Sequence, residues 1–449
     1  MRFPRADRNR WVLASVLAIV VAAAVAYVIV DLSKPSKTAP SVPPTTTTAT
    51  TPPPPPPPAP TITTPTTPAK RRVNNFTVPF YGNHQTRDRQ FTAIPSLNPP
   101  FKLAWQFGGN ALLEFPATIW GNNLYLLDDG ATVKRVNITT GKQIWAKHMG
   151  ELSASTPSLD VAHKELFVSI LSTTGSTIGS TNGELAALSM RSGKTLWKFP
   201  VSSGTESSPM VVGHSVYFGD QAGTEYSLNI RTGHENWSLS TGGSIKAGAA
   251  YHDGKLYFGN YAGSFYAVNA KSGTVAWSAS PGGEFYSTPA VAYGRVYVGN
   301  NDDDAYAFAA SDGAVSWTQS LGSYVYSGPA VADTPGLGPT VYIGSYDHDL
   351  YALNAANGSV RWAADVGGAI SGSATVVNDT VYVSTVYEKG SYGFNARTGQ
   401  RVFYFPDGSY TTVVADKTAL FLMGKYTLYK LVPRDARVPK SKRKHRPKK

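Results

Sequence analysis

The sequence contains no cysteine among its 449 residues. This absence excludes disulfides, cysteine-ligated zinc, iron–sulfur clusters and thiol nucleophiles. Charged residues are also scarce, at 16% of the chain, and the scattered histidines include no close pair that would indicate a zinc site. With 42% hydrophobic residues the chain is not wholly disordered, yet it is too long for one compact core. We therefore expect several domains or a repeat array, held together by packing and hydrogen bonds.

The net charge of +12 is concentrated at the ends of the chain. Residues 1–10, 31–72 and 433–449 carry charges of +3, +4 and +8, which leaves −3 for residues 73–432. The main part of the protein therefore does not resemble a nucleic-acid-binding domain. We interpret residues 433–449 as a basic disordered tail, which outside a cell would be attracted to anionic wall polymers or lipid headgroups.

Residues 11–30 form one apolar run that is interrupted only by Ser15. As a helix this run spans roughly 30 Å, the thickness of the hydrocarbon core of a bilayer. The four arginines within residues 1–10 indicate that this N-terminus stays cytoplasmic and that the rest of the chain is exported. We predict a single-pass signal anchor in a bacterial cell membrane. A cleaved secretory signal is the alternative, because residues 24–26 read Ala-Val-Ala.

Residues 31–72 are dominated by proline and threonine, with seven consecutive prolines at 52–58. Proline lacks the backbone donor that helices and sheets require, so this segment is expected to be an extended, disordered polyproline II stalk. Such a stalk would lift the domain that follows it away from the membrane.

An internal repeat occupies most of the remaining sequence. Segments such as VNITTGKQIW, LNIRTGHENW and VNAKSGTVAW place a glycine four residues before an aromatic residue. From the first aromatic residue onward the spacings are 40, 52, 40, 40, 40, 45 and 41. The repeated aromatic positions are Trp105, Trp145, Trp197, Trp237, Trp277, Trp317, Trp362 and Phe403.

Each period contains four short segments of strand-like sequence separated by turn residues. In residues 278–317 these segments read STPAVAY, RVYVGN, DAYAFAA and AVSWTQS. A four-stranded unit of about 40 residues that recurs many times is typical of a β-propeller blade. Three strands after Phe403 lack a fourth, and the strand around Trp105 lacks a blade. Joining them predicts an all-β, eight-bladed propeller over residues 101–432, closed by strands from both of its ends; seven blades is the alternative.

The repeat x-N-A-x-x-G-x-x-x-W resembles the tryptophan-docking repeat of the pyrroloquinoline quinone (PQQ)-type propeller superfamily. That superfamily includes quinoprotein alcohol dehydrogenases and the BamB-type assembly lipoproteins. The resemblance implies that each repeated indole packs between its own blade and the next. Residues 73–100, with VPFYGNHQTRDRQF at 78–91, resemble the lead-in that precedes such propellers.

The resemblance also implies what a quinone site would need. Quinoprotein dehydrogenases typically hold PQQ between a vicinal disulfide and a tryptophan, with calcium and a catalytic aspartate. The lack of cysteine removes the disulfide, and we expect no PQQ. The acidic runs at 302–304 and 347–349 suggest calcium at first sight, but they fall where other repeats have a tight turn, which Asp and Asn favour. We therefore expect neither calcium nor any other metal.

Ligands of propellers bind where the innermost strands meet the central channel. The repeat alignment places seven residues just before the first strand of their blades: Glu114, Glu206, Lys246, Tyr286, Tyr326, Ser371 and Tyr410. Tyrosines with charges of both signs suit a peptide or a carbohydrate better than a small hydrophobic ligand. We therefore expect a non-catalytic extracytoplasmic scaffold that binds protein or cell-wall polymer partners. A PQQ-dependent or other quinoprotein oxidoreductase is the alternative.

Overall fold

The computed structural model describes residues 77–109, 111–173 and 182–436. All of them belong to one compact unit, Ala59–Lys449, and a second unit, Met1–Pro58, lies outside the described residues. The predicted anchor and stalk and nearly all of the basic tail also lie outside the described residues. Within the described ranges, no helix has both the length and the apolar character needed to cross a bilayer.

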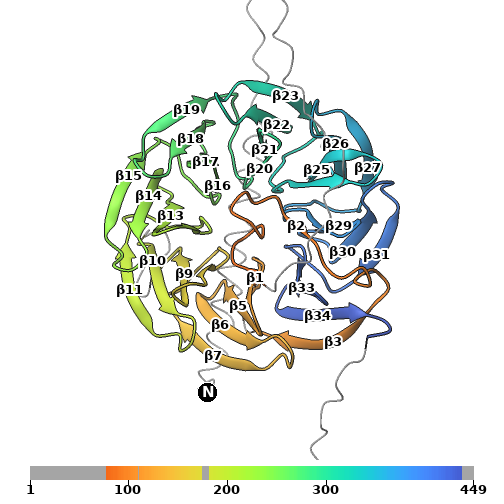
Figure 1. Ribbon diagram of the computed structural model, residues 1–449, viewed down its shortest axis with the longest axis horizontal. Coiled ribbons are helices and arrows are strands. Elements are labelled where there is room, and N and C mark those ends of the chain that lie inside the picture. The colour runs from red at the N-terminus through yellow and green to blue at the C-terminus, as the bar shows by residue number, and fades with distance from the viewer. Residues whose placement is uncertain (1–76, 110, 174–181, 437–449) are drawn as a thin grey trace, which may run out of the picture. The chain divides into compact units, whose positions relative to one another are not determined.

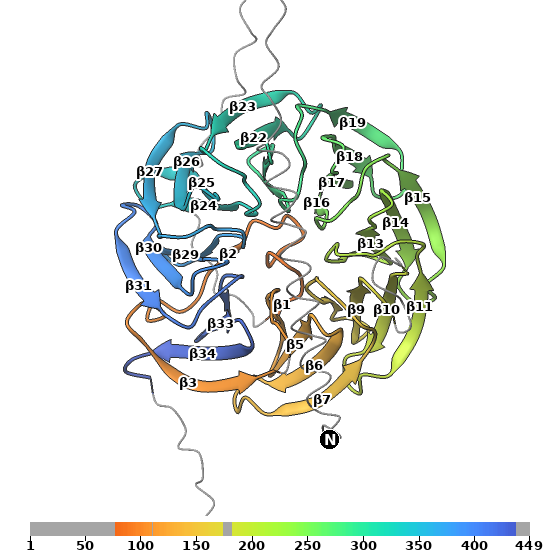
Figure 2. The same cartoon turned by 180° about the vertical axis from the view of Figure 1, so that it is seen from behind.

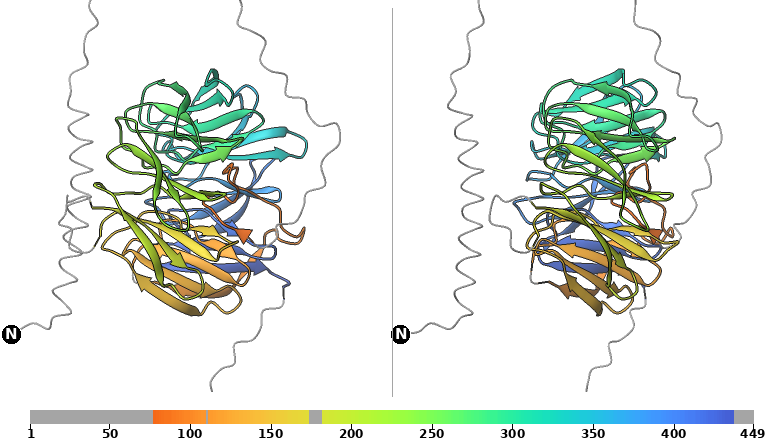
Figure 3. Two further views of the ribbon diagram at one scale, coloured as in Figure 1. Left: turned by 60° about the vertical axis from the view of Figure 1, so that its left-hand side comes forward. Right: turned by 90° about the vertical axis from the view of Figure 1, so that its left-hand side faces the viewer.

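Eight β-sheets form a ring around a central axis (Figures 1 and 2). The predicted all-β, eight-bladed propeller is therefore confirmed, and the seven-bladed alternative is wrong. No helix occurs among the described residues. Figure 3 shows the same ring from two further sides.

The blades are numbered here in chain order, and their strands are given from the innermost to the outermost. Blade 1 consists of β1 (Thr77–Val78), β4 (Thr118–Trp120), β5 (Asn123–Asp128), β6 (Thr132–Asn137) and β7 (Gln143–His148). Blade 2 consists of β8 (Ser158–Asp160), β9 (Glu165–Ile170), β10 (Glu184–Ser189) and β11 (Thr195–Pro200), and blade 3 of β12 (Met210–Val212), β13 (Ser215–Gly219), β14 (Thr224–Asn229) and β15 (Glu235–Ser240). Blade 4 consists of β16 (Ala250–His252), β17 (Lys255–Gly259), β18 (Phe265–Asn269) and β19 (Val275–Ala279). Blade 5 consists of β20 (Ala290–Ala292), β21 (Arg295–Gly299), β22 (Asp304–Ala309) and β23 (Val315–Ser320), and blade 6 of β24 (Ala330–Thr334), β25 (Gly338–Gly344), β26 (Asp349–Asn354) and β27 (Val360–Asp365). Blade 7 consists of β2 (Gln90–Phe91), β28 (Thr375–Val377), β29 (Thr380–Ser384), β30 (Ser391–Asn395) and β31 (Arg401–Phe405). Blade 8 consists of β32 (Val414–Ala415), β33 (Leu420–Gly424), β34 (Thr427–Pro433) and β3 (Phe101–Gly108).

The hydrophobic core lies between neighbouring blades. Second strands such as β9 and β21 are buried along their whole length, because a blade covers each of their faces. Outermost strands such as β7 are mostly exposed. One core cluster, for example, joins Tyr125 and Leu127 of blade 1 to Leu166 and Val168 of blade 2. Each blade is therefore stabilised by its neighbours, as in other repeat architectures.

The ring closes in blade 8, where strands from the two ends of the described chain pair. Strand β3 pairs antiparallel with β34, with Lys102 opposite Val432 and Phe107 opposite Leu428. This closure, predicted above, removes two open sheet edges.

All seven repeated tryptophans donate a hydrogen bond to the next blade. Each indole Nε1 lies 2.8–3.3 Å from a backbone carbonyl oxygen that follows the third strand of the neighbouring sheet. The acceptors, in the order of the tryptophans, are Ile138, Met190, Ile230, Ala270, Ala310, Ala355 and Ala396. Each indole therefore fills the gap between two blades and satisfies its single donor there.

The glycine of each repeat packs against the tryptophan of the preceding repeat. Gly313, for example, has a φ of +77°, and a Cβ built on it would lie 2.5 Å from Cε3 of Trp277. The equivalent glycine of the following blade, Gly358, has the same relation to Trp317, at 2.7 Å. The repeat therefore needs glycine both for its left-handed turn and for this close approach.

Phe403 replaces tryptophan in blade 7, and the ring closure explains why. The third and fourth strands of blade 8 are β34 and β3, which no turn connects, so this blade lacks the glycine turn on which the tryptophans of the other blades pack. The ring of Phe403 instead packs edge-on against Phe101 of β3, with centroids 5.6 Å apart.

Candidate functional site

A segment of the lead-in, residues 77–94, fills the axis of the ring (Figures 1 and 2). We call it the plug. Its first strand, β1, pairs with β4 of blade 1, and its second, β2, pairs in parallel with β28 of blade 7. Between them its carbonyl oxygens accept hydrogen bonds from innermost strands of four further blades, with Tyr251 N–Gln85 O at 2.7 Å and Val331 N–Asp88 O at 2.8 Å as examples.

The plug reaches every blade. Besides the pairings with blades 1 and 7, its hydrogen bonds join Pro79 to Leu159 of blade 2, Gln85 to Val211 and Tyr251 of blades 3 and 4, Thr86 to Val291 of blade 5, Asp88 to Val331 of blade 6, and Ile94 to Lys417 beside the innermost strand of blade 8. Sequence reasoning treated this segment only as a lead-in and did not place it in the channel.

Two arginines of the plug are fully buried. The guanidinium of Arg87 donates to the carbonyl oxygens of Ala249 at 2.6 Å, Tyr81 at 2.7 Å and Ser208 at 2.9 Å. Burial lowers the pKa of Arg87 to about 9. Arg89 donates in the same way to three carbonyl oxygens of the plug and of blades 5 and 6. Backbone carbonyls thus compensate these two charges, which lie just beneath the lining of the cavity described next.

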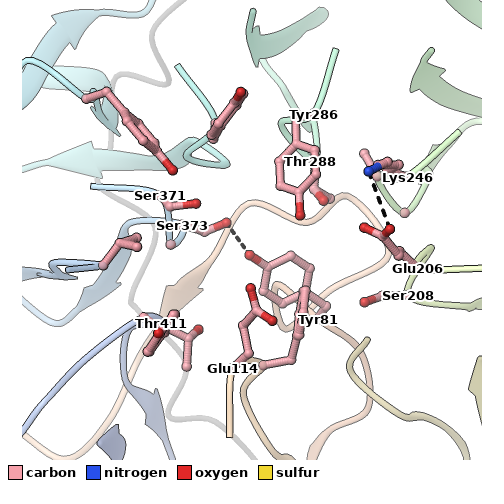
Figure 4. Close-up of a pocket in the computed structure, with 18 of the residues that line it drawn as sticks. Tyr81, Glu114, Glu206, Ser208, Lys246, Tyr286, Thr288, Ser371, Ser373 and Thr411 are labelled. Carbon is pink, nitrogen blue, oxygen red and sulfur yellow. Dashed lines mark hydrogen bonds and ion pairs between the residues drawn. The ribbon is translucent and has the colours of Figure 1, made fainter. Parts of the chain in front are cut away.

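A cavity of about 370 Å³ surrounds the axis on one side of the plug (Figure 4). All seven residues that the repeat alignment placed at the channel line this one cavity, and all seven are half-buried. Blades 1, 3, 4, 5, 6, 7 and 8 each contribute one of them, namely Glu114, Glu206, Lys246, Tyr286, Tyr326, Ser371 and Tyr410. The eightfold repetition therefore converts seven separate sequence positions into a single site.

Tyrosines form a continuous aromatic wall along blades 4 to 6. The ring centroids of Tyr261 and Tyr286 are 6.1 Å apart, and those of Tyr286 and Tyr326 are 4.9 Å apart. Tyr346 continues the series, 4.9 Å from Tyr326. Toward solvent this wall reaches Tyr324, which is 45% exposed and 6.0 Å from Tyr326.

The one basic residue among those that line the cavity is already paired. Nζ of Lys246 lies 3.4 Å from Oε1 of Glu206 and 5.0 Å from the centroid of the Tyr261 ring. Gln221 also donates to Oε1 of Glu206, at 2.5 Å. This cluster holds Lys246 and Glu206 together on the wall beside the tyrosines.

Glu114 is different, since no side chain of the described residues donates a hydrogen bond to its carboxyl group. Burial, together with the charge of Glu206, raises the pKa of Glu114 to about 7. Asp129 stands nearby, and burial and the charge of Glu114 raise its pKa to about 8. Figure 4 shows Glu114 beside Tyr81, whose hydroxyl group is hydrogen-bonded to Ser373.

The acidic runs lie in turns between second and third strands, where the sequence placed them. The hydroxyl group of Tyr306 donates to Asp302 at 2.6 Å, and that of Tyr351 donates to Asp347 at 2.6 Å. Within the part of the chain that the structure describes, no group of three or more His, Asp or Glu residues is placed to hold a metal ion.

Sequence reasoning missed part of the aromatic wall. Tyr261 and Tyr346 both occupy the second position after the glycine that ends the second strand of their blade. At the same position Gln221 and Asn301 hydrogen-bond to Glu206 and Tyr326, which line the cavity. The repeat therefore carried a signal for a second set of lining residues, but we interpreted this turn only as a turn.

A family model described as outer membrane protein assembly factor BamB matches residues 129–247 and 226–438, which together make up more than half of the chain. The chain belongs to this family. No curated protein sequence matches this member significantly. The residues matched include six of the seven tryptophans, so the resemblance seen in the repeat is confirmed.

Solved structures with the same fold come from proteins of different function. BamB from Moraxella catarrhalis aligns with a TM-score of 0.63 at 15% identity, covering 76% of this chain and 99% of its own. Quinohemoprotein alcohol dehydrogenase from Comamonas testosteroni aligns with a TM-score of 0.64 at 12% identity, covering 81% of this chain and 82% of its own. At such low identity these similarities establish the fold alone.

Proposed function

We propose that this BamB-family protein is a non-catalytic binding module, anchored in the membrane and exported, that holds a protein or a cell-wall polymer at its axial cavity. The observation that carries this proposal is that seven blades each contribute a half-buried side chain to one cavity, whose lining mixes polar and aromatic groups. The apolar run at 11–30 and the proline-rich segment at 31–72 support the anchored, extracytoplasmic placement.

The quinoprotein alternative can be weighed against the lining of the same cavity. PQQ is a tricarboxylate, so a site for it needs basic groups and a bound cation. Lys246 is the one basic residue among those that line the cavity, and it is paired with Glu206. Arg87 and Arg89 lie beneath the lining with their guanidinium groups bonded to carbonyls. The residues present suit this group poorly, and we derive no reaction step through it.

Two measurements test the proposal. In the first, the purified full-length protein is incubated with PQQ and calcium and assayed for dye reduction across alcohols and sugars. We expect no turnover, and robust turnover would contradict a non-catalytic role.

In the second, a photo-crosslinking amino acid replaces Tyr326 in the cavity or, as the matched control, Tyr404 on the outermost strand β31, which is 50% exposed. Crosslinking is carried out in the cells that produce the protein. We expect an adduct from position 326 and none from position 404. Sensitivity of the adduct to protease or to a wall hydrolase then identifies the partner as protein or polymer. No adduct from position 326, or equal adducts from both, would refute binding at the cavity.

A further inference from the structure

The lining of the cavity combines aromatic rings with hydrogen-bonding groups. Along blades 4 to 6 the lining is the aromatic wall of Tyr261, Tyr286, Tyr326 and Tyr346. Blades 7, 8 and 1 contribute the hydroxyl and carboxyl groups of Ser371, Ser373, Thr411 and Glu114, together with the further aromatic rings Phe115, Tyr387 and Tyr410. A ligand that fills this space therefore needs one apolar face and an edge that carries hydrogen-bonding groups.

The charges of the site do not call for a charged ligand. Lys246 and Glu206 compensate each other at 3.4 Å. Arg87 and Arg89 donate to backbone carbonyls beneath the lining, with Nε of Arg89 the one donor atom of the pair that lacks a partner among the described residues. Glu114 is the remaining lining carboxyl group, and with its pKa raised to about 7 it is only partly charged at neutral pH. Its oxygen atoms have no donor among the described side chains and can accept from a ligand.

The volume and the mouth of the cavity add a restriction on length. At about 370 Å³ the cavity is at the lower end of the roughly 300–1,000 Å³ of ligand pockets. Two tyrosines continue the aromatic surface toward solvent, Tyr324 at 45% exposure and Tyr387 at 75%. A ligand can therefore place one end in the cavity and let the rest of its chain pass over these rings.

We propose that the cavity binds the end of a neutral glycan chain, with a pyranose ring stacked on the tyrosine wall and its hydroxyl groups bonded to Glu114 and Ser371. A pyranose has the required chemistry, because its C–H face packs on aromatic rings while its equatorial hydroxyls both donate and accept hydrogen bonds. This inference rests on the proposed function and narrows its two partner classes to the wall polymer.

The experiment is isothermal titration calorimetry of the full-length protein at pH 7 with chitotriose, cellotriose, maltotriose and mannotriose. Choline, acetate and a lysine-containing tripeptide serve as charged and peptide probes. We expect at least one trisaccharide to bind more tightly than all three of these. No binding of any trisaccharide, or tighter binding of a charged or peptide probe, would overturn the proposal.

Substitutions locate the binding within the cavity. Tyr326→Ala removes a central ring of the wall and should weaken trisaccharide binding by about tenfold. Tyr326→Phe keeps the ring and should change the affinity by less than about threefold. Tyr404→Ala, on the outer surface, should leave the affinity unchanged. Equal affinity of Tyr326→Ala and wild type would overturn the proposal, and circular dichroism shows whether each variant is folded.

The glycan proposal and the proposed function fail in different ways. A protease-sensitive adduct at position 326 combined with no trisaccharide binding would leave the binding module intact and refute the glycan. No adduct at position 326 would refute the binding module itself.

Discussion

The backbone carbonyl oxygen of Ala310, a half-buried residue of blade 5, accepts hydrogen bonds from two side chains of blade 4. Nε1 of Trp277 lies 3.1 Å from it and Oη of Tyr257 lies 3.3 Å from it. The two donors come from different strands, β19 and β17, and both side chains are buried. The carbonyl therefore stays paired when either donor is removed and loses both partners only when the two are removed together.

This arrangement predicts a coupling between two substitutions. Trp277→Phe and Tyr257→Phe each remove one donor and keep an aromatic ring, and a single hydrogen bond contributes about 1 kcal/mol net. Trp277→Phe also loses packing volume, but that loss is the same in both arms of the cycle. In the double variant this partly buried carbonyl has lost both donors and bears a desolvation cost of about 1 kcal/mol, the low end of the range for buried groups. The double variant should therefore be less stable than the sum of the singles by about 1 kcal/mol.

The assay is urea denaturation at 25 °C, followed by circular dichroism because the substitution changes tryptophan fluorescence. The control cycle combines Trp277→Phe with Tyr217→Phe, because Tyr217 donates to a different carbonyl, that of Ala270. We expect this control pair to be additive within about 0.5 kcal/mol. A coupling below about 0.5 kcal/mol for Trp277 and Tyr257 would refute the idea that the shared carbonyl links the two blades.

Three further predictions concern the blade contact, the plug and the cavity acids. Gly313→Ala should lower the free energy of unfolding in urea by about 2 kcal/mol or more, because the φ of Gly313 is +77° and the added methyl group would meet Trp277. Gly254 has the same φ but open space around it, so Gly254→Ala should lower the free energy of unfolding by less. Arg87→Met should cost about 3 kcal/mol or more, since it leaves buried carbonyls without a donor; a loss under 1 kcal/mol would show that the plug contributes little to stability. The pKa of Asp129 is raised to about 8, so its folded form binds a proton that the unfolded chain releases above about pH 4, and stability falls as the pH rises toward 8. Asp129→Asn should therefore gain about 2 kcal/mol relative to wild type at pH 8 and little at pH 4, and an equal gain at both would contradict the raised pKa.

The blade count could be predicted from sequence because the repeat records contacts between neighbours. The spacing of Trp145 to Phe403 sets the number of complete blades, and the unpaired strands around Trp105 and after Phe403 can be satisfied only by pairing with each other. The positions just before each first strand, such as Glu114 and Tyr286, could also be predicted, since equivalent positions of a symmetric ring face the same axis. The repeat spacing and the equivalent channel positions recur with each blade, so they can be recognised in a single sequence.

The plug could not be predicted in this way. Its sequence, GNHQTRDRQ at 82–90, has the polar composition of a solvated loop. Arg87 and Arg89 are buried because backbone carbonyls of distant blades receive their guanidinium groups. Those partners are separated from the arginines by more than a hundred residues, and no local pattern records them. Tyr261 and Tyr346 were missed for another reason. They stand in turns that follow the second strands of their blades, and the need for a turn was a sufficient explanation of those segments.

The plug also determines where a pulling force would act on this protein. Going along the chain from its N-terminal side, the plug at 77–94 precedes the closing strand β3 at Phe101–Gly108. Tension applied from that side reaches the plug first, and the plug distributes the load over inner strands of all eight blades. The closing strand β3 is pulled directly by the chain only after the plug has been pulled out of the channel. A tether at this end would therefore load the contacts of the plug with all eight blades before it pulls directly on the pairing of β3 with β34.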